Sequence, residues 1–150
     1  MKLAEIENAL IDLIKAGLPY LGENVQVATQ RNFDSEGNIL AIPPAVLLIY
    51  AGAQGSHLDP HALTYAAQPR WLVAAGASNL RGALEEKQGD AASGAKGAYD
   101  LVDDLRALGG KKLPDRSLVV WRGDELLQHS ADGTWYAVTF EVRGHFVNAE

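Results

Sequence analysis

The segment that most constrains this chain is an unbroken apolar run, Ala45-Val46-Leu47-Leu48-Ile49-Tyr50, which follows Pro43 and Pro44. Its length is typical of a β-strand. A strand whose side chains are all apolar has to be covered on both faces. The run therefore predicts a buried strand, and it is the candidate for the central strand of a sheet.

Two amphipathic helices are expected, one before this strand and one after it. From Leu3 to Ala16, Leu and Ile recur at a spacing of three and four residues with charged residues between them, and Gly17 and Pro19 end the pattern. A second apolar stripe runs from Ala95 to Leu108 and ends at Gly109-Gly110. Both stripes need an apolar surface to cover.

Four further segments have the pattern of strands. Val25–Val27 predicts a short, half-buried strand, and Arg70–Ala75 predicts a strand that pairs with the central one through a long loop. Leu118–Trp121 and the alternating residues Tyr136–Val142 predict the last two strands. Asp132-Gly133 is a turn dipeptide between them, so we expect a terminal antiparallel pair.

Three polar segments are expected to be loops. Gln30–Ile42 includes a polar turn, and Gly52–Gln68 reads as an excursion with at most a short turn of helix. Asn79–Gly94 is punctuated by glycines, with room for a short helix through Ala83–Lys87. We expect these loops to make contacts with other proteins.

The predicted fold is a single α+β domain spanning residues 1–150. A chain of 150 residues buries roughly 70% of its unfolded surface, which is enough for one core. The elements follow the order α-β-β-β-α-β-β and predict one mixed sheet of about five strands, with the two long helices on one face. The other sheet face and the sheet edges are then natural interaction surfaces.

Charge and composition argue against several classes of function. The formal net charge of −6 and the pI near 5.1 argue against sequence-specific nucleic-acid binding, which needs clustered Lys and Arg. The chain contains no cysteine, so we expect neither disulfides nor cysteine-bound zinc. The acidic residues near the N-terminus argue against a signal peptide or membrane span, and synthesis in the cytoplasm is expected.

No catalytic constellation is found in the sequence. In Gly89–Gly97, Ala95 separates the second glycine from Lys96, and Gly97 stands where a phosphate loop has Ser or Thr. Gly55-Ser56-His57 lacks the glycine of a nucleophile elbow. His57, Asp59 and His61 are the best metal-ligand candidates, but Pro60 interrupts them. We therefore predict no enzyme activity and no cofactor or metal, and expect the three tryptophans of the predicted strands to be core residues or interface anchors.

Four groups of strings add a resemblance. They are Pro44-Ala45-Val46-Leu47 with Tyr50-Ala51-Gly52, Arg70-Trp71-Leu72-Val73 with Ala77-Ser78-Asn79-Leu80-Arg81-Gly82, Gly97-Ala98-Tyr99-Asp100-Leu101, and Tyr136-Ala137-Val138-Thr139-Phe140-Glu141. In combination with the order of elements, they resemble the tail terminator or tail-completion family of Mu-like contractile phages and related prophages. The resemblance extends from the first helix to the last strand.

This resemblance implies a small structural subunit that self-associates into a ring, commonly hexameric, at the head-proximal end of the tail tube. The ring would stop tube polymerisation and join the tail to the head connector, so its partners would be tube, sheath and connector proteins, with no membrane. The subunit would be found in the host cytoplasm during assembly and afterwards in the virion tail. The family supplies no catalytic residue.

The candidate contact residues lie in the third loop. We expect Asn79 and Arg81 to be polar anchors, and Glu85 and Glu86 to pair with basic residues of a neighbour. Two alternatives remain open: another neck or baseplate-associated virion subunit, and a small-ligand or metal-binding module centred on His57 and His61.

Overall fold

The computed structural model describes residues 2–59, 64–78, 96–130 and 133–148. The helical elements are α1 (Leu3–Gly17), η1 (Pro19–Leu21), η2 (Gln30–Asn32) and α3 (Ala98–Arg106). The strands are β1 (Val25–Val27), β2 (Ala45–Asp59), β3 (Thr64–Ala77), β4 (Leu118–Ser130), β5 (Gly133–Arg143) and β6 (His145–Asn148). The predicted helix through Ala83–Lys87 lies outside the described residues.

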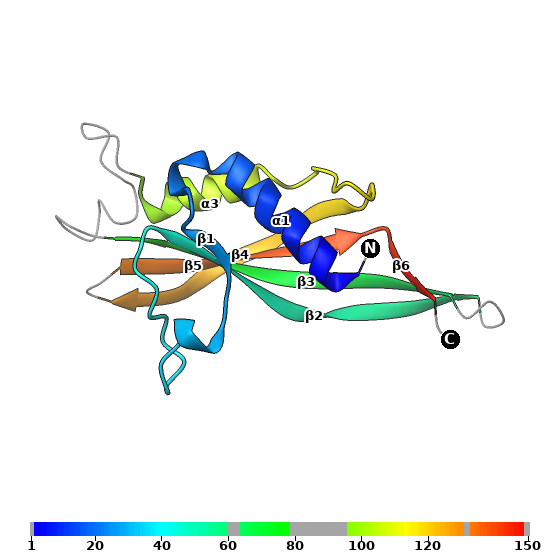
Figure 1. The fold of residues 1–150 in the computed structure, drawn as a ribbon, viewed down its shortest axis with the longest axis horizontal. Helices are drawn as coiled ribbons and strands as arrows, with labels where there is room; N and C mark the ends of the chain where they lie inside the picture. Colours follow the sequence, from blue (N-terminus) through cyan, green and yellow to red (C-terminus); the bar gives the residue numbers. More distant parts are fainter. Residues whose placement is uncertain (1, 60–63, 79–95, 131–132, 149–150) are drawn as a thin grey trace.

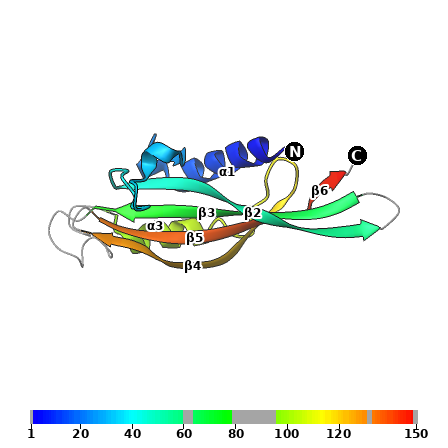
Figure 2. The same ribbon diagram turned by 90° about the horizontal axis from the view of Figure 1, so that it is seen from below.

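The strands form one mixed sheet in the order β1-β2-β3-β5-β4 (Figures 1 and 2). β1 runs parallel to β2, and the other neighbours are antiparallel. β6, which the sequence analysis missed, pairs with the far end of β3. The predicted α+β class and the terminal antiparallel pair are thus confirmed. The middle strand is β3, however: β2 is an interior strand with β1 on its outer side.

Both α-helices cover the same face of the sheet (Figure 1). The inward side of α1 carries Ile6, Leu10 and Ile14, and that of α3 carries Leu101 and Leu105, all at most 1% exposed. Facing them are alternate residues of the strands, among which the fully buried are Val46, Leu48, Trp71, Val73 and Val138. Apolar residues that recur about every 3.6 positions along the helices therefore pack against apolar residues that recur every second position along the strands, as the sequence pattern predicts.

The opposite face is covered over part of its area by residues 28–43, which we call the covering segment (Figure 1). Ile39 and Phe33 of this segment pack with Leu47, Ala74 and Trp135, which point away from the helices. The backbone N–H of Ala28 donates to the carbonyl of Leu48 at 2.9 Å. Both faces of the apolar run Ala45–Leu48 are thereby buried.

The prediction of an irregular excursion at Gly52–Gln68 is wrong. β2 continues to Asp59 and β3 begins at Thr64, so the two strands form a long hairpin whose far end projects from the body as an arm (Figures 1 and 2). Backbone pairing holds the arm, with the register running from Gln54 opposite Gln68 to Asp59 opposite Thr64. Because Ala, Gly and Ser dominate the outgoing strand, no apolar alternation marked it as a strand.

Candidate functional site

The predicted contact residues Asn79, Arg81, Glu85 and Glu86 lie outside the described residues. His61 does as well, and His57 and Asp59 are placed only by their backbone, on β2. Within the described part of the chain, no group of three His, Asp or Glu residues is arranged to hold a metal ion. None of the described helices has the length and apolar character to cross a membrane.

The sheet face opposite the helices is divided into two halves. The covering segment occupies the half that contains Trp135, where the backbone N–H of Ile39 donates to Oε1 of Gln128 at 2.8 Å. The other half, formed by the ends of β3, β4 and β5 near Arg70 and Arg143, has no covering layer among the described residues. We call it the open half-face.

An arginine cluster occupies the open half-face. Glu141 of β5 is 1% exposed, and three arginines from three neighbouring strands surround it. Nε of Arg143 lies 2.7 Å from Oε1, and Nε of Arg70 lies 3.0 Å from Oε2. Nε of Arg122 lies 3.8 Å from Oε2. The three arginine side chains stay 36–46% exposed, so they form the surface above a buried acid.

The register of the sheet produces this convergence. Arg70 and Glu141 are directly opposite each other on β3 and β5, and Arg143 follows Glu141 by two residues, which places both on one face. Arg122 lies at an irregularity of β4, between the pairs of Trp121 and Gly123. Such a shift re-aims side chains in a strand. The sequence showed isolated charges in apolar strands but not this register, and so the cluster was not foreseen.

The electrostatics of the cluster favour an ionised Glu141. Burial alone would raise the pKa of Glu141, but hydrogen bonds from Arg143 and Arg70, together with the charges of Arg143 and Arg122, hold this pKa below its ordinary value. The carboxylate carries one negative charge and the arginines carry three positive ones. The cluster therefore keeps a net positive charge in a protein whose formal net charge is −6.

A second surface feature lies beside the covering segment. A hollow of about 330 Å³ is lined by Leu40, Ile42, Pro43 and Trp135, with Gln128 at its polar side. Ile42 is 85% exposed, so a branched aliphatic side chain stands in solvent at the rim. This rim belongs to Gln30–Ile42, one of the three segments expected to make contacts.

The tryptophans divide into two groups. Trp71 and Trp135 are buried core residues, whereas Trp121 is 42% exposed. The guanidinium carbon of Arg106 lies 5.2 Å from the centre of the Trp121 ring, and Arg106 also binds the carboxylate of Asp124 through two nitrogens, at 2.7 and 2.9 Å. Trp121 is thus the tryptophan that fits the expected role of an interface anchor.

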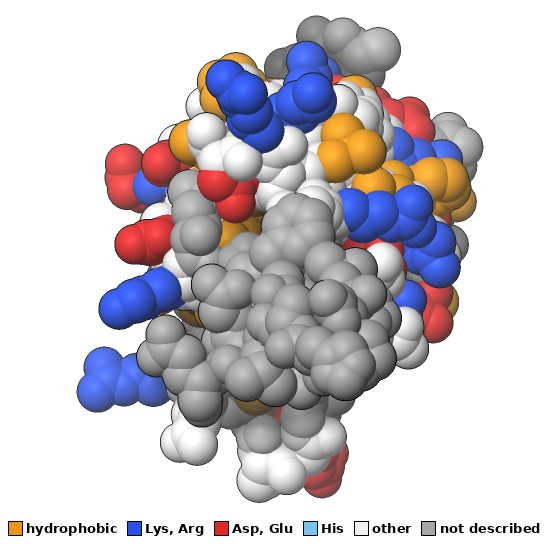
Figure 3. All heavy atoms as spheres, turned by 90° about the vertical axis from the view of Figure 1, so that its right-hand side faces the viewer, with side chains coloured by type: hydrophobic (Ala, Val, Ile, Leu, Met, Phe, Trp, Pro, Cys, Tyr) orange, Lys and Arg blue, Asp and Glu red, His pale blue; other side chains and the backbone are white. Residues whose placement is uncertain are grey.

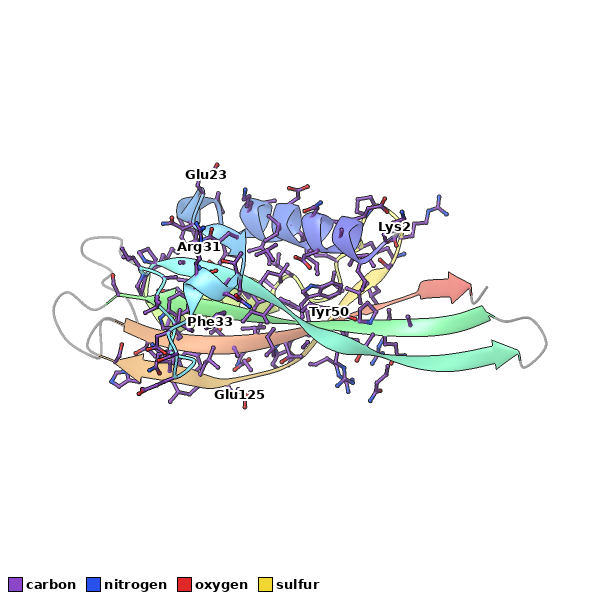
Figure 4. The ribbon with its side chains drawn as sticks, turned by 60° about the horizontal axis from the view of Figure 1, so that its bottom comes forward. Lys2, Glu23, Arg31, Phe33, Tyr50 and Glu125 are labelled. Carbon is purple, nitrogen blue, oxygen red and sulfur yellow. The ribbon has the colours of Figure 1, made fainter. Side chains whose placement is uncertain are left out.

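Charged side chains surround the end of the molecule from which the arm projects. Figure 3 looks at this end and shows Lys and Arg side chains at its upper, left and right edges, with Asp and Glu side chains beside them. Lys2 and Glu23 lie in the helix layer on one side of the sheet, whereas Glu125 of β4 points away from the other side (Figure 4). The two broad faces therefore differ in architecture.

Comparisons with known proteins agree with this architecture. A family model described as Bacteriophage Mu, Gp37 matches residues 2–142. A chain of the solved structure "Virion of native gene transfer agent (GTA) particle" has a similar fold, with a TM-score of 0.51 and 14% sequence identity, over 91% of this chain and 95% of that chain. The search of curated proteins found no match. Because the family model spans nearly the whole chain, this protein belongs to the Bacteriophage Mu, Gp37 family.

Proposed function

We propose that this member of a phage structural protein family is a tail terminator or tail-completion subunit. The observation that carries the proposal is the family match over residues 2–142. The strings that resemble Mu-like tail terminators and the fold shared with a chain of the gene transfer agent virion support it. In this role the protein caps the head-proximal end of the tail tube and joins the tail to the head connector.

The shape of the molecule suits a ring of identical subunits. A closed heterologous ring needs two different surfaces on each subunit, because each copy meets its neighbours through unlike faces. The helix layer and the open half-face are two such surfaces on opposite sides of one sheet (Figures 1 and 2). We infer a homo-oligomeric ring, hexameric by the resemblance, that assembles in the host cytoplasm and remains in the virion tail.

The proposed contacts with tube, sheath and connector come from three segments. Gln30–Ile42 contributes the exposed rim at Ile42, and Gly52–Gln68 contributes the projecting arm. Asn79–Gly94 contributes Asn79, Arg81, Glu85 and Glu86, as the sequence analysis proposes. Mutations in each of the three segments can therefore test the proposed contacts.

Electron microscopy of tails tests the proposal. Tails from a mutant that lacks this gene should be overlong or unjoined to heads, and purified protein added back should restore uniform length and head attachment. Normal tails in the mutant would overturn termination. Defects confined to the neck or baseplate would instead favour the alternative of another neck or baseplate-associated subunit.

A charge reversal tests the proposed anchor in the third loop. Arg81→Glu should weaken attachment to the tail while leaving the thermal unfolding temperature unchanged, if Arg81 binds an acidic neighbour. The add-back assay measures this directly. Full restoration of tails by a normally folded Arg81→Glu protein would remove Arg81 from the contact.

A further inference from the structure

The arginine cluster holds three guanidinium groups in positions from which they can bind a further anion. In all three contacts it is Nε that approaches Glu141. Nε carries only one of the five N–H donors of a guanidinium, so the donors on the terminal nitrogens are not used by these contacts. The buried carboxylate also restricts the side chains in advance, which lowers the entropy that each arginine loses on binding a partner.

The opposite side of the molecule carries an acidic stripe. Glu5 and Asp12 are exposed residues of α1, seven positions apart, and Asn8 lies between them. Oε2 of Glu5 accepts a hydrogen bond from the backbone N–H of Lys2 at 3.0 Å, so Asp12 is the acid that the structure leaves for a partner to bind. At about 100° per residue, positions seven apart point within about 20° of each other. The stripe faces away from Ile6 and Leu10, which are buried against the sheet. It therefore lies on the outer surface of the helix layer. Figure 1 shows α1 on one side of the sheet, and the strand register places the arginine cluster on the other.

We propose that the arginine cluster is the docking site for the acidic stripe of α1 on a second copy of this chain. The inference rests on the ring assembly of the proposed function and names the surfaces that form it. Copies of a chain with a net charge of −6 repel one another, so a close contact between them needs a local positive site. The cluster supplies that site, and a head-to-tail contact uses the two sides of the sheet.

A second copy fits the cluster better than DNA does. Binding to DNA neutralises several phosphates spaced along a backbone and needs a basic stripe. Here the three arginines converge on one carboxylate within 4 Å, in an acidic protein. An exposed carboxylate on the outer side of a helix, such as Asp12, is the better match for such a focus of positive charge.

Charge exchange tests the contact. Arg122→Glu is chosen because Arg122 makes the longest contact to Glu141, and Arg122→Gln covers the case in which a second acid disturbs folding. Arg122→Glu and Asp12→Lys should each weaken self-association about tenfold or more, measured by sedimentation of the purified chain and by its retention on tails. The double variant should recover the association, because the positive and negative members of the pair formed by positions 12 and 122 are then exchanged. Lys111→Glu, an exposed turn residue, controls for net charge.

Cysteine cross-linking gives a test that does not depend on affinity. The chain has no cysteine, so the double variant Arg122→Cys/Asp12→Cys carries two defined thiols. With a short bis-maleimide, a head-to-tail contact yields a ladder of multimers, and each single-cysteine variant yields dimers at most. The reaction is run on the free protein and on tail-bound protein. No ladder in either sample would overturn the proposal.

The outcomes also separate this inference from the proposed function. A ladder together with normal tails in the gene-deletion mutant would keep the contact and reject termination. Restored tails with no ladder and no effect of Arg122→Glu would keep termination and reject the contact. Binding of a fluorescent DNA duplex that is lost in Arg122→Glu, with self-association unchanged, would assign the cluster to nucleic acid and overturn the inference.

Discussion

At the scale of single residues, Glu141 is expected to contribute to stability through its three arginine partners. Replacing Glu141 by Gln leaves Arg70, Arg122 and Arg143 without their counter-charge and should reduce the free energy of unfolding at pH 7 by about 1–3 kcal/mol, a range lowered by the solvent exposure of the arginines. Urea denaturation measures the loss. Glu125→Gln on β4 is the matched control, since Glu125 is exposed and should lose little.

The difference in stability between the wild-type protein and Glu141→Gln should depend on pH. The pKa of Glu141 is lower in the folded protein than in the unfolded chain, so its contribution is fully present above about pH 4.3 and is lost as the pH falls through the folded-state pKa. The difference in stability between wild type and Glu141→Gln should therefore shrink as the pH is lowered from 5 towards 3. A difference that stays constant over this range would contradict the arrangement of charges.

Gly76 is a position at which a side chain would disturb the core. A Cβ at Gly76 would lie 2.4 Å from atoms of the buried Trp135 ring. Overpacking a core typically costs about 1–3 kcal/mol, so Gly76→Ala should lower the free energy of unfolding by about 3 kcal/mol or more at this close contact. In a Trp135→Leu background the same substitution should cost much less, since the ring is gone. Equal costs in the two backgrounds, measured by denaturation, would exclude the ring contact as the cause.

At the scale of elements, the covering segment depends on one carboxylate. Oδ1 of Asp34 accepts hydrogen bonds from the backbone N–H groups of Glu36 and Asn38 at 2.9 and 2.8 Å, and Oδ2 accepts one from Nδ2 of Asn38. Asp34→Ala should raise hydrogen exchange of the amides of residues 36–39 by about tenfold or more, while strand amides keep their protection. Ser35→Ala is the exposed control. Unchanged exchange would show that packing alone holds the turn.

Elements with a strong side-chain period could be predicted from the sequence, and elements held by backbone pairing could not. α1 was placed within a residue at each end, and the strand starting at Ala45 was placed from its apolar run. The outgoing arm strand, rich in Ala and Gly, has no apolar period in its sequence. Backbone hydrogen bonds to β3 hold it in place, and burial of its side chains does not, so the sequence predicts a loop there. β6 was missed as well, although it pairs with β3 in the same way.

The arginine cluster shows why a site is harder to predict than a fold. Arg70, Arg122, Glu141 and Arg143 lie up to 73 residues apart, as the numbers 70 and 143 show, and only the strand order β3-β5-β4 brings them together. Each charge read alone suits the solvated side of a strand. Strand order and register depend on long-range pairing, which the local pattern of one sequence does not specify.

At the scale of the whole molecule, the projecting arm lies outside the buried core. The described core residues lie in the body, whereas Ala51, Ala53 and Gln54 at the base of the arm are exposed. Beyond Leu48, no described strand pairs with the outer edge of β2. An open edge with few charged residues, here Asp59 at its far end, readily pairs with another chain, so this part of Gly52–Gln68 is suited to the contacts proposed above.

A shortened hairpin tests the role of the arm. Replacing residues 55–67 by Asn-Gly keeps the paired residues Gln54 and Gln68 and closes them with a two-residue turn. The replacement also removes the residues of β3 that pair with β6, so the shortened protein ends at residue 144. Because the core is left intact, the thermal unfolding temperature should stay within about 4 °C of wild type, a shift that corresponds to roughly 1–2 kcal/mol for a domain of this size. Retention on tails should nevertheless fall sharply, and it is measured by co-sedimentation beside a full-length control carrying Gln54→Ser. A shortened protein that folds and caps tails normally would show that the arm is dispensable, whereas one that unfolds would show that the arm stabilises the body.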